Sequence, residues 1–318
     1  MTTSAYHPLD IPRYTLRQLA YFVTAADLGT TSAAAQAHVM SQSAMSSALS
    51  DLEAALGVQL LIRNKAKGVS VTEVGKALLP QARALLAGAD EFQAQGLAFG
   101  HELSGRLVIG CHTTIAPFVL PRLLHDFGTE HPAVELDFVE GSLPMLEAML
   151  LEGNCEVAIT YDFHLGQGIE RRHLYTPVPH VLLSTNHPLA DEKKVSLATL
   201  APEPVVFLDV APSEHVFRSA FEAAGAKPNI RYRTVSFEHA RALVARELGY
   251  TLLTQRVSGA LDRWGSAVVS KPLSENVPSL PIVLATAAGV RHTRRAQAFS
   301  TYCAAALRHD TSHEERGD

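Results

Sequence analysis

Apolar residues recur at helical spacing along the first part of the chain. One stripe comprises Leu16, Leu19, Phe22 and Val23, and a second comprises Met45, Ala48, Leu49, Leu52 and Leu56. The second series follows the i, i+3, i+4, i+7 rule for one face of a helix. Its opposite face carries small polar side chains, namely Gln42, Ser43, Ser46, Ser47 and Ser50. Two short strands, 59–63 and 69–71, are then predicted around the turn residues 64–68.

A long helix is predicted to start after Thr72, which can cap it, and to run to about residue 99. Within it, one apolar series is spaced alternately four and three residues apart and forms a short coiled-coil seam: Leu78, Ala82, Leu85, Ala89 and Phe92. Pro80 lies inside this stretch, and proline removes a helical hydrogen bond. A kink or break near Ala77 is therefore expected.

From Leu103 onwards, strand-like runs alternate with helical runs. This alternation predicts α/β architecture with mainly parallel sheets, and the length of the stretch suits two lobes. The fold class is thus α+β and multi-domain. The expected division is a tail at 1–13, a segment of short helices and a hairpin at 14–71, a long helix at 72–100, and an α/β part at 101–318.

Composition narrows the class of protein without naming its function. The chain has 318 residues, of which 47% are hydrophobic and 19% charged, as in globular proteins. No apolar run reaches the roughly 18 residues of a membrane helix, and the N-terminus lacks the pattern of a signal peptide. Three scattered cysteines indicate a reducing compartment, so we expect a cytoplasmic protein. The net charge is −5, with +1 on residues 1–90 and −6 on the remainder, which leaves the partner open.

Two short helices followed by a basic hairpin are typical of a winged helix-turn-helix that binds double-stranded DNA. Gln42 can pair bidentately with adenine, and serine hydroxyls can contact bases or phosphates. The candidate DNA-binding residues are Ser41, Gln42, Ser43, Ser46 and Ser47 on the second helix, and Arg63, Lys65 and Lys67 on the wing. On the pattern alone, an all-α packing with solvated serines is an equal alternative.

A family resemblance decides between these alternatives. The segment 16–79 resembles the N-terminal domain of LysR-type transcriptional regulators, and its matching elements lie in one register. They include Leu16-Arg17-Gln18-Leu19, Ala34-Ala35, Ser41-Gln42, Leu52-Glu53, Leu56-Gly57, Arg63 and Thr72-Glu73-Gly75. Later stretches, among them 106–114, 120–142 and 240–255, resemble the two sensor lobes of the same family.

The resemblance implies a homodimer or homotetramer on promoter half-sites. Residues 14–71 are then a winged helix-turn-helix DNA-binding domain, 72–100 a linker and dimerisation helix, and 101–318 an effector-binding domain. That domain has two hinged lobes, similar to periplasmic binding proteins, around a small-molecule effector. Lobe I is expected at about 103–162 and 269–308, and lobe II at about 163–268. Three residues depart from the family pattern. Thr31 replaces the usual aromatic residue ahead of the first motif helix, Ser43 replaces proline, and Ser47 stands where arginine is frequent. The second helix therefore carries no cation, which puts the strength of DNA binding in question.

A small organic acid is the expected effector. The strand that ends at Cys111 leads into a helix, and a helix N-terminus with hydroxyls favours anions. The candidate effector-binding residues follow the family's strand ends: His112, Thr113, Thr114, Gly141, Ser142, Tyr161, Phe207, Ser236 and Phe237. The alternative for each threonine or serine is a simple helix cap.

Two other classes of protein remain as alternatives: an enzyme and a solute-binding protein that uses the two-lobed cleft. An enzyme would need Cys111, His112 and Asp162 or Glu238 to meet, but no catalytic motif is present, so no catalytic residue is predicted. A solute-binding protein would lack the N-terminal hundred residues. Cys111 could sense redox state, although the predicted lobe II contains no second cysteine. His309 and His313 lie four residues apart and could bind a metal on a helix, but they lie in a polar tail, so no metal or cofactor is expected.

Overall fold

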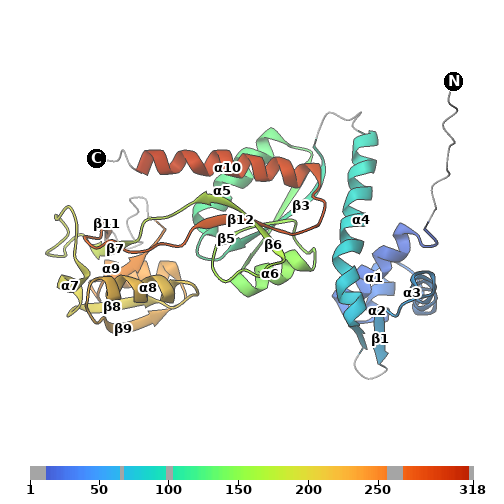
Figure 1. Ribbon diagram of the computed structural model, residues 1–318, viewed down its shortest axis with the longest axis horizontal. Helices are drawn as coiled ribbons and strands as arrows, with labels where there is room; N and C mark the ends of the chain where they lie inside the picture. The colour runs from blue at the N-terminus through green and yellow to red at the C-terminus, as the bar shows by residue number, and fades with distance from the viewer. Residues whose placement is uncertain (1–11, 65–67, 98–102, 256–267, 315–318) are drawn as a thin grey trace. The chain divides into compact units, whose positions relative to one another are not determined.

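The structure is a computed structural model that describes residues 12–64, 68–97, 103–255 and 268–314. Contacts divide the chain into two compact units (Figure 1). The N-terminal unit consists mainly of residues 1–105, and the C-terminal unit contains most of the remainder.

The N-terminal unit is a winged helix-turn-helix followed by a long helix, as the sequence predicts. Its elements are α1 (Leu16–Leu28), α2 (Thr31–Ala37), α3 (Gln42–Leu56), β1 (Leu61–Asn64), β2 (Gly68–Val71) and α4 (Glu73–Leu97). β1 and β2 pair antiparallel as the wing. Thr15 and Gln18 cap α1 reciprocally, and Ser41 caps α3, which explains where these helices start.

The core of this unit is built by the two apolar stripes of the sequence. Leu19 and Phe22 of α1 are buried against Met45, Leu49 and Leu52 of α3. Leu60, Leu61, Leu79 and Ala82 complete the cluster, so the wing and α4 are anchored to the same core. Gly75, in the first turn of α4, leaves room for this approach, because a Cβ there would lie 2.3 Å from the carbonyl oxygen of Leu60.

The helix α4 is continuous from Glu73 to Leu97 and contains Pro80 (Figure 1). The break that we expected near Ala77 is therefore absent. Proline costs one backbone hydrogen bond, and the packing of Leu79 and Ala82 into the core stabilises the helix on both sides of it.

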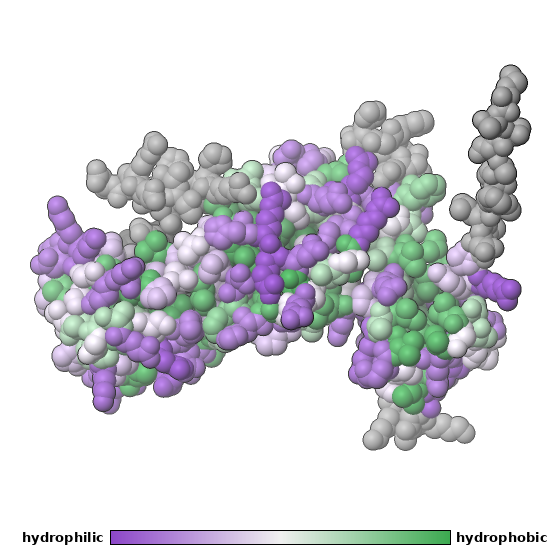
Figure 2. All heavy atoms as spheres, viewed as in Figure 1, coloured by the Kyte–Doolittle hydropathy of each residue, from purple (hydrophilic) through white to green (hydrophobic). Residues whose placement is uncertain are grey.

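The predicted seam on α4 divides between two faces. Ala82 is buried in the core of its own unit and Leu78 packs against that core. Leu85 and Phe92, by contrast, are 50% and 81% exposed, and Val74 on the same side is 45% exposed. Hydrophobic side chains reach the visible surface of this unit in Figure 2. The exposed apolar face of α4 is thus formed by Val74, Leu85 and Phe92, rather than by the whole predicted seam.

The C-terminal unit contains two α/β lobes. In lobe I, a five-stranded sheet has the order β4-β3-β5-β12-β6. Its strands are β3 (Gly105–His112), β4 (Val134–Gly141), β5 (Val157–Tyr161), β6 (Ile169–Tyr175) and β12 (Ile282–Ala287). The helices of this lobe are α5 (Ala116–Glu130), α6 (Leu143–Leu151) and α10 (Arg294–Glu314).

Lobe II holds a three-stranded sheet, β10-β7-β11, and the parallel pair β8-β9. Its strands are β7 (His180–Ser184), β8 (Pro204–Leu208), β9 (Asn229–Thr234), β10 (Thr251–Leu253) and β11 (Val268–Pro272). Its helices are α7 (Leu197–Leu200), α8 (Ser213–Ala223) and α9 (Phe237–Ala245). Phe217 and Phe221 of α8 are buried against Phe207 of β8 in the core of this lobe.

Two sequence expectations about these lobes are wrong. The sheets are not mainly parallel, because β12 pairs antiparallel with β5 and β6, and β7 pairs antiparallel with β10 and β11. The boundaries also shift: β6 belongs to the sheet of lobe I, and β11 belongs to that of lobe II. The chain therefore leaves the sheet of lobe I after Tyr175 and returns to it after Pro272.

Within the described residues, no helix has both the length and the apolar character needed to span a membrane. In the same part of the chain, no three His, Cys, Asp or Glu side chains gather as a metal site would require.

Candidate DNA-reading surface and effector pocket

The N-terminal turn of α3 presents small polar side chains to solvent. Ser41, Gln42, Ser43 and Ser47 are exposed, and Ser46 is half-buried. The Ser41 hydroxyl accepts the Ala44 N–H at 3.2 Å as the cap and lies 3.0 Å from the Ser43 hydroxyl. Since the N-terminal residues of the second motif helix contact base edges, this turn is the candidate reading surface.

The side chain of Gln42 is held by the preceding helix. Its Nε2 donates to the hydroxyl of Thr31, the first residue of α2, at 3.3 Å. Both residues are polar, so the contact orients a carboxamide without burying it. The sequence indicated Gln42 as a base reader but contained no signal for this partner.

Arg63 of the wing contacts α3 instead of extending freely towards solvent. Its guanidinium donates to the Ser50 hydroxyl at 3.1 Å and to the Ser46 carbonyl at 3.4 Å, and it pairs with Glu53 at 3.4 Å. The other carboxylate oxygen of Glu53 accepts the backbone N–H groups of Leu60 and Leu61. This network fixes the start of the wing to α3. Lys65 and Lys67 lie outside the described residues.

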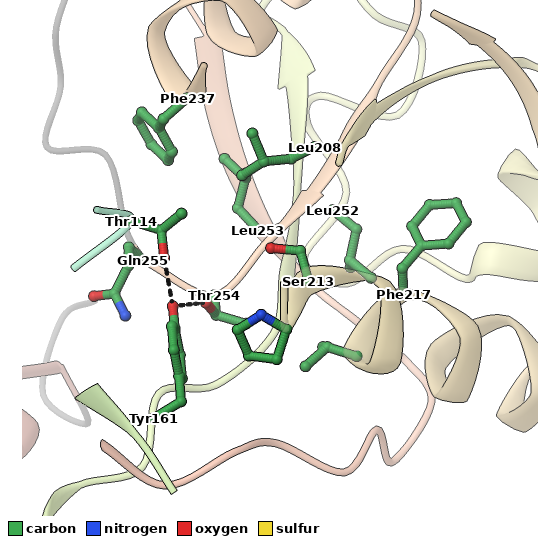
Figure 3. A pocket seen from close by; sticks show the side chains of 12 residues that line it. Thr114, Tyr161, Leu208, Ser213, Phe217, Phe237, Leu252, Leu253, Thr254 and Gln255 are labelled. Atoms are coloured by element: carbon green, nitrogen blue, oxygen red, sulfur yellow. Dashed lines mark hydrogen bonds between the residues drawn. The ribbon is translucent and has the colours of Figure 1, made fainter. Parts of the chain in front are cut away.

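A pocket in the C-terminal unit is lined from both lobes (Figure 3). Its lining is mainly apolar. Four polar side chains lie together on one side of it in the close-up: Thr114, Tyr161, Thr254 and Gln255. The apolar part comprises Leu208, Pro212, Val216, Phe217, Phe237, Leu252 and Leu253. No charged side chain lines it among the described residues.

A chain of hydrogen bonds links the two lobes at this pocket. His112 Nε2 lies 3.0 Å from the carbonyl oxygen of Ala211, which can only accept, so Nε2 carries the hydrogen and Nδ1 accepts from Thr114 at 2.9 Å. The Thr114 hydroxyl contacts that of Tyr161 at 3.0 Å, and Tyr161 lies 3.5 Å from that of Thr254 (Figure 3). His112 is fully buried, and burial lowers its pKa from 6.5 to about 4.

Gln255 provides the unsatisfied polar group of the pocket. The side chain is 7% exposed, and its Oε1 accepts from the Tyr175 hydroxyl at 3.2 Å. Its Nε2 is buried and has no hydrogen-bond partner among the described residues. A buried amide nitrogen without an acceptor is costly, so this donor suits an acceptor on a bound molecule.

Of the residues predicted from sequence to bind the effector, Thr114, Tyr161 and Phe237 line the pocket, and His112 touches it through Thr114. Thr113 is exposed and its N–H donates to the Gly141 carbonyl at 3.2 Å. The remaining predicted residues lie outside the lining: Gly141, Ser142, Phe207 and Ser236. Ser236 caps α9, the alternative role that its sequence position allowed. Thr254 and Gln255 follow β10 and were missed, although they also follow a strand end.

The cysteines do not have the features of a redox sensor. Cys111, Cys155 and Cys303 are all buried. Burial raises the pKa of Cys111 and Cys303 and raises that of Cys155 to about 12. A reactive thiol needs exposure and a lowered pKa, and in this structure none of the three has either feature.

Known families match both units. The family described as "Bacterial regulatory helix-turn-helix protein, lysR family" matches residues 16–76, and the "LysR substrate binding domain" matches residues 100–308. The Hca operon transcriptional activator HcaR of Escherichia coli is 30% identical over 278 residues, which cover 85% of this chain and 90% of HcaR. The dual regulator OxyR of the same organism is 30% identical over 243 residues, covering 75% and 78%.

A crystal structure of HinK, a LysR family transcriptional regulator from Pseudomonas aeruginosa, has 34% sequence identity and a TM-score of 0.63. The similarity covers 92% of this chain and 98% of HinK. The exposed polar turn of α3, the wing and the two-lobed domain with its pocket agree with both family matches. The chain therefore belongs to the LysR family of transcriptional regulators, with an N-terminal DNA-binding domain and a C-terminal effector-binding domain.

Proposed function

We propose that the N-terminal turn of α3 reads a specific promoter sequence, with Gln42, Ser43 and Ser46 facing base edges and Ser41 and Ser47 beside them. The observation that carries the proposal is that this turn is exposed, polar and fixed by Thr31 on one side and by Arg63 on the other. Arg63 then acts chiefly as a positioning residue, and Lys65 and Lys67 of the wing neutralise phosphates.

A mobility shift with the full chain and the DNA upstream of its own coding region tests this role. Gln42→Ala should weaken specific binding by about 1–3 kcal/mol and leave binding to random duplex unchanged. An equal loss on both DNAs would show that Gln42 does not read a base.

The proposed assembly is a homodimer, or a homotetramer formed from two such dimers, joined through α4. Its support is the exposed apolar face of Val74, Leu85 and Phe92, since exposed apolar patches on a helix mark interaction sites. Two copies would place two α3 helices on half-sites one turn of DNA apart. Promoter DNA as the partner, together with three unpaired cysteines, favours the cytoplasm as the location of this assembly.

The proposed effector is a small organic acid with an apolar body, bound in the pocket of Figure 3. The unsatisfied group there, Gln255 Nε2, is a donor, and a carboxylate oxygen is a strong acceptor. The proposed effector is of the chemical class expected from the sequence, but its carboxylate contacts Gln255 in place of Thr113. Thr113 is exposed, and its N–H donates to the Gly141 carbonyl. The proposed activity is regulation without catalysis.

A thermal-shift screen of the full chain against carboxylic acids and their matched amides tests the effector. Gln255→Leu should lower the affinity for a hit at least several-fold, because it removes a donor from a buried acceptor. Thr113→Val serves as the matched control and should bind normally. The anchor is wrong if Thr113→Val lowers affinity while Gln255→Leu does not, and the acid class is wrong if only amides bind.

A further inference from the structure

We propose that Thr31 is a positioning residue that sets the base preference of Gln42, an inference that rests on the DNA-reading role proposed above. The distance of 3.3 Å from Gln42 Nε2 to the Thr31 hydroxyl oxygen connects the first turn of α2 with the first turn of α3. No other described side chain hydrogen-bonds to Gln42.

The position of Thr31 is itself well fixed. It begins α2, whose N-cap Thr30 accepts the Ala33 N–H at 3.1 Å. Ala34 and Ala35 of the same helix are buried in the core, so α2 cannot shift easily relative to α3. Thr31 therefore offers an oxygen at a defined place on the reading surface.

This contact leaves free the groups that adenine requires. A primary amide has two N–H donors and one oxygen with two lone pairs. With one N–H of Gln42 directed to Thr31, its second N–H and its Oε1 remain for the N7 and N6 positions of adenine, the usual bidentate pairing. Thr31 thus selects a direction for the carboxamide that presents this edge to DNA.

Pre-orientation matters because glutamine is flexible. An exposed glutamine loses much rotamer freedom when it binds a base, and a contact made before binding reduces that loss. This smaller entropy loss favours only DNA whose base pairs with the Gln42 carboxamide in the orientation that Thr31 holds. Thr31 should therefore affect discrimination between bases more than affinity for DNA in general.

The experiment uses the full chain and a duplex library with a random central sequence, from which wild-type protein selects its preferred sites. Affinity is then measured for the four bases at each selected position. Thr31→Val, which keeps the shape and removes the hydroxyl, should lower the preference for adenine at one position of each half-site by about 3- to 10-fold. Thr31→Ser should restore it. Random-duplex affinity and thermal unfolding should not change in either variant.

Combination with Gln42→Ala separates the inference from the function on which it rests. Gln42→Ala should abolish the preference, and Thr31→Val added to it should have no further effect. If Gln42→Ala abolishes the preference but Thr31→Val leaves it within about twofold of wild type, the role of Thr31 is refuted alone. If Gln42→Ala leaves every base preference intact, the reading role of Gln42 fails and the inference fails with it.

Discussion

Single side chains in this protein connect segments that are distant in sequence. Glu53 of α3 accepts the N–H groups of Leu60 at 2.8 Å and Leu61 at 3.0 Å, and it also pairs with Arg63. Both leucines are 1% exposed, so their amides have no access to bulk water. Leu60 lies between α3 and β1, and Leu61 is the first residue of β1. The Glu53 carboxylate supplies an acceptor for the backbone N–H groups of both.

Glu53→Ala should destabilise the wing by about 2–4 kcal/mol, because it leaves two buried donors unsatisfied. Glu53→Gln, which keeps an acceptor oxygen, should cost less than half as much. Hydrogen exchange at the Leu60 and Leu61 amides in the full chain measures the effect locally. Unchanged exchange rates in Glu53→Ala would show that Glu53 does not stabilise these two amides.

His112 makes the stability of the C-terminal unit dependent on pH. Its pKa falls from 6.5 to about 4 because it is buried, while the bond to the Ala211 carbonyl opposes the shift. Between these pH values the unfolded chain binds a proton that the folded chain does not, so stability decreases as the pH falls. The window runs from about pH 6.5 down to pH 4, and its contribution is on the order of 3 kcal/mol.

Urea unfolding of the full chain across this window should therefore show a steeper loss of stability for wild type than for His112→Asn. The exposed His125 supplies the control, since His125→Asn should follow the wild-type slope. Parallel curves for wild type and His112→Asn would show that His112 titrates normally.

At the scale of elements, α4 has one face packed against its own unit and another exposed to solvent. Leu79 and Ala82 anchor it to the core of the N-terminal unit, whereas Leu85 and Phe92 face solvent. The two sets lie on different faces because a helix turns once every 3.6 residues. An element that stabilises its own domain can therefore also present a surface for association.

Leu85→Glu combined with Phe92→Glu should reduce the association state and operator binding together, since it places charges in the proposed interface. Gln93→Glu adds a negative charge to an exposed position on another face of α4 and should leave both unchanged. Sedimentation and mobility shift measure the two properties. A full oligomer with normal affinity in the double variant would exclude this face.

The whole molecule carries a net charge of −5, and its reading helix has no lysine or arginine. Arg63, which lies close to that helix, is paired with Glu53. We therefore expect general attraction to DNA to be weak and the wing to dominate the electrostatic part of binding. Specificity should then depend on the polar turn of α3.

Lys65→Ala and Lys67→Ala should each lower the slope of log affinity against log salt by about one unit, because each removes the cation that neutralises one phosphate. The change should be the same on specific and random DNA. Lys193→Ala in lobe II should leave the slope unaltered. An unchanged slope in both wing variants would assign phosphate neutralisation to other residues.

Local patterns determined a large part of this structure. The stripes on α1 and α3, the caps at Thr15 and Ser41 and the turn of the wing were readable because each depends on residues a few positions apart. The strands β6, β9 and β11 were not predicted. Arg171, Arg172 and Arg231 make β6 and β9 polar, and both strands lie at the edges of their sheets. β6 pairs with β12, which lies more than a hundred residues later in the chain, and β9 pairs with β8, more than twenty residues earlier. Local sequence does not show pairing over such separations.

By itself, then, the sequence determined the helix-turn-helix, the wing, the long helix, the two-lobed α/β domain and the polar face of α3, because periodicity and family motifs are properties of the chain. Only the tertiary structure decided that Arg63 pairs with Glu53, that Thr31 holds Gln42 and that Ala82 faces inwards. It also decided that Gln255, and not Thr113, reaches the pocket. Each of these depends on the distance between elements, which packing sets and local sequence does not encode.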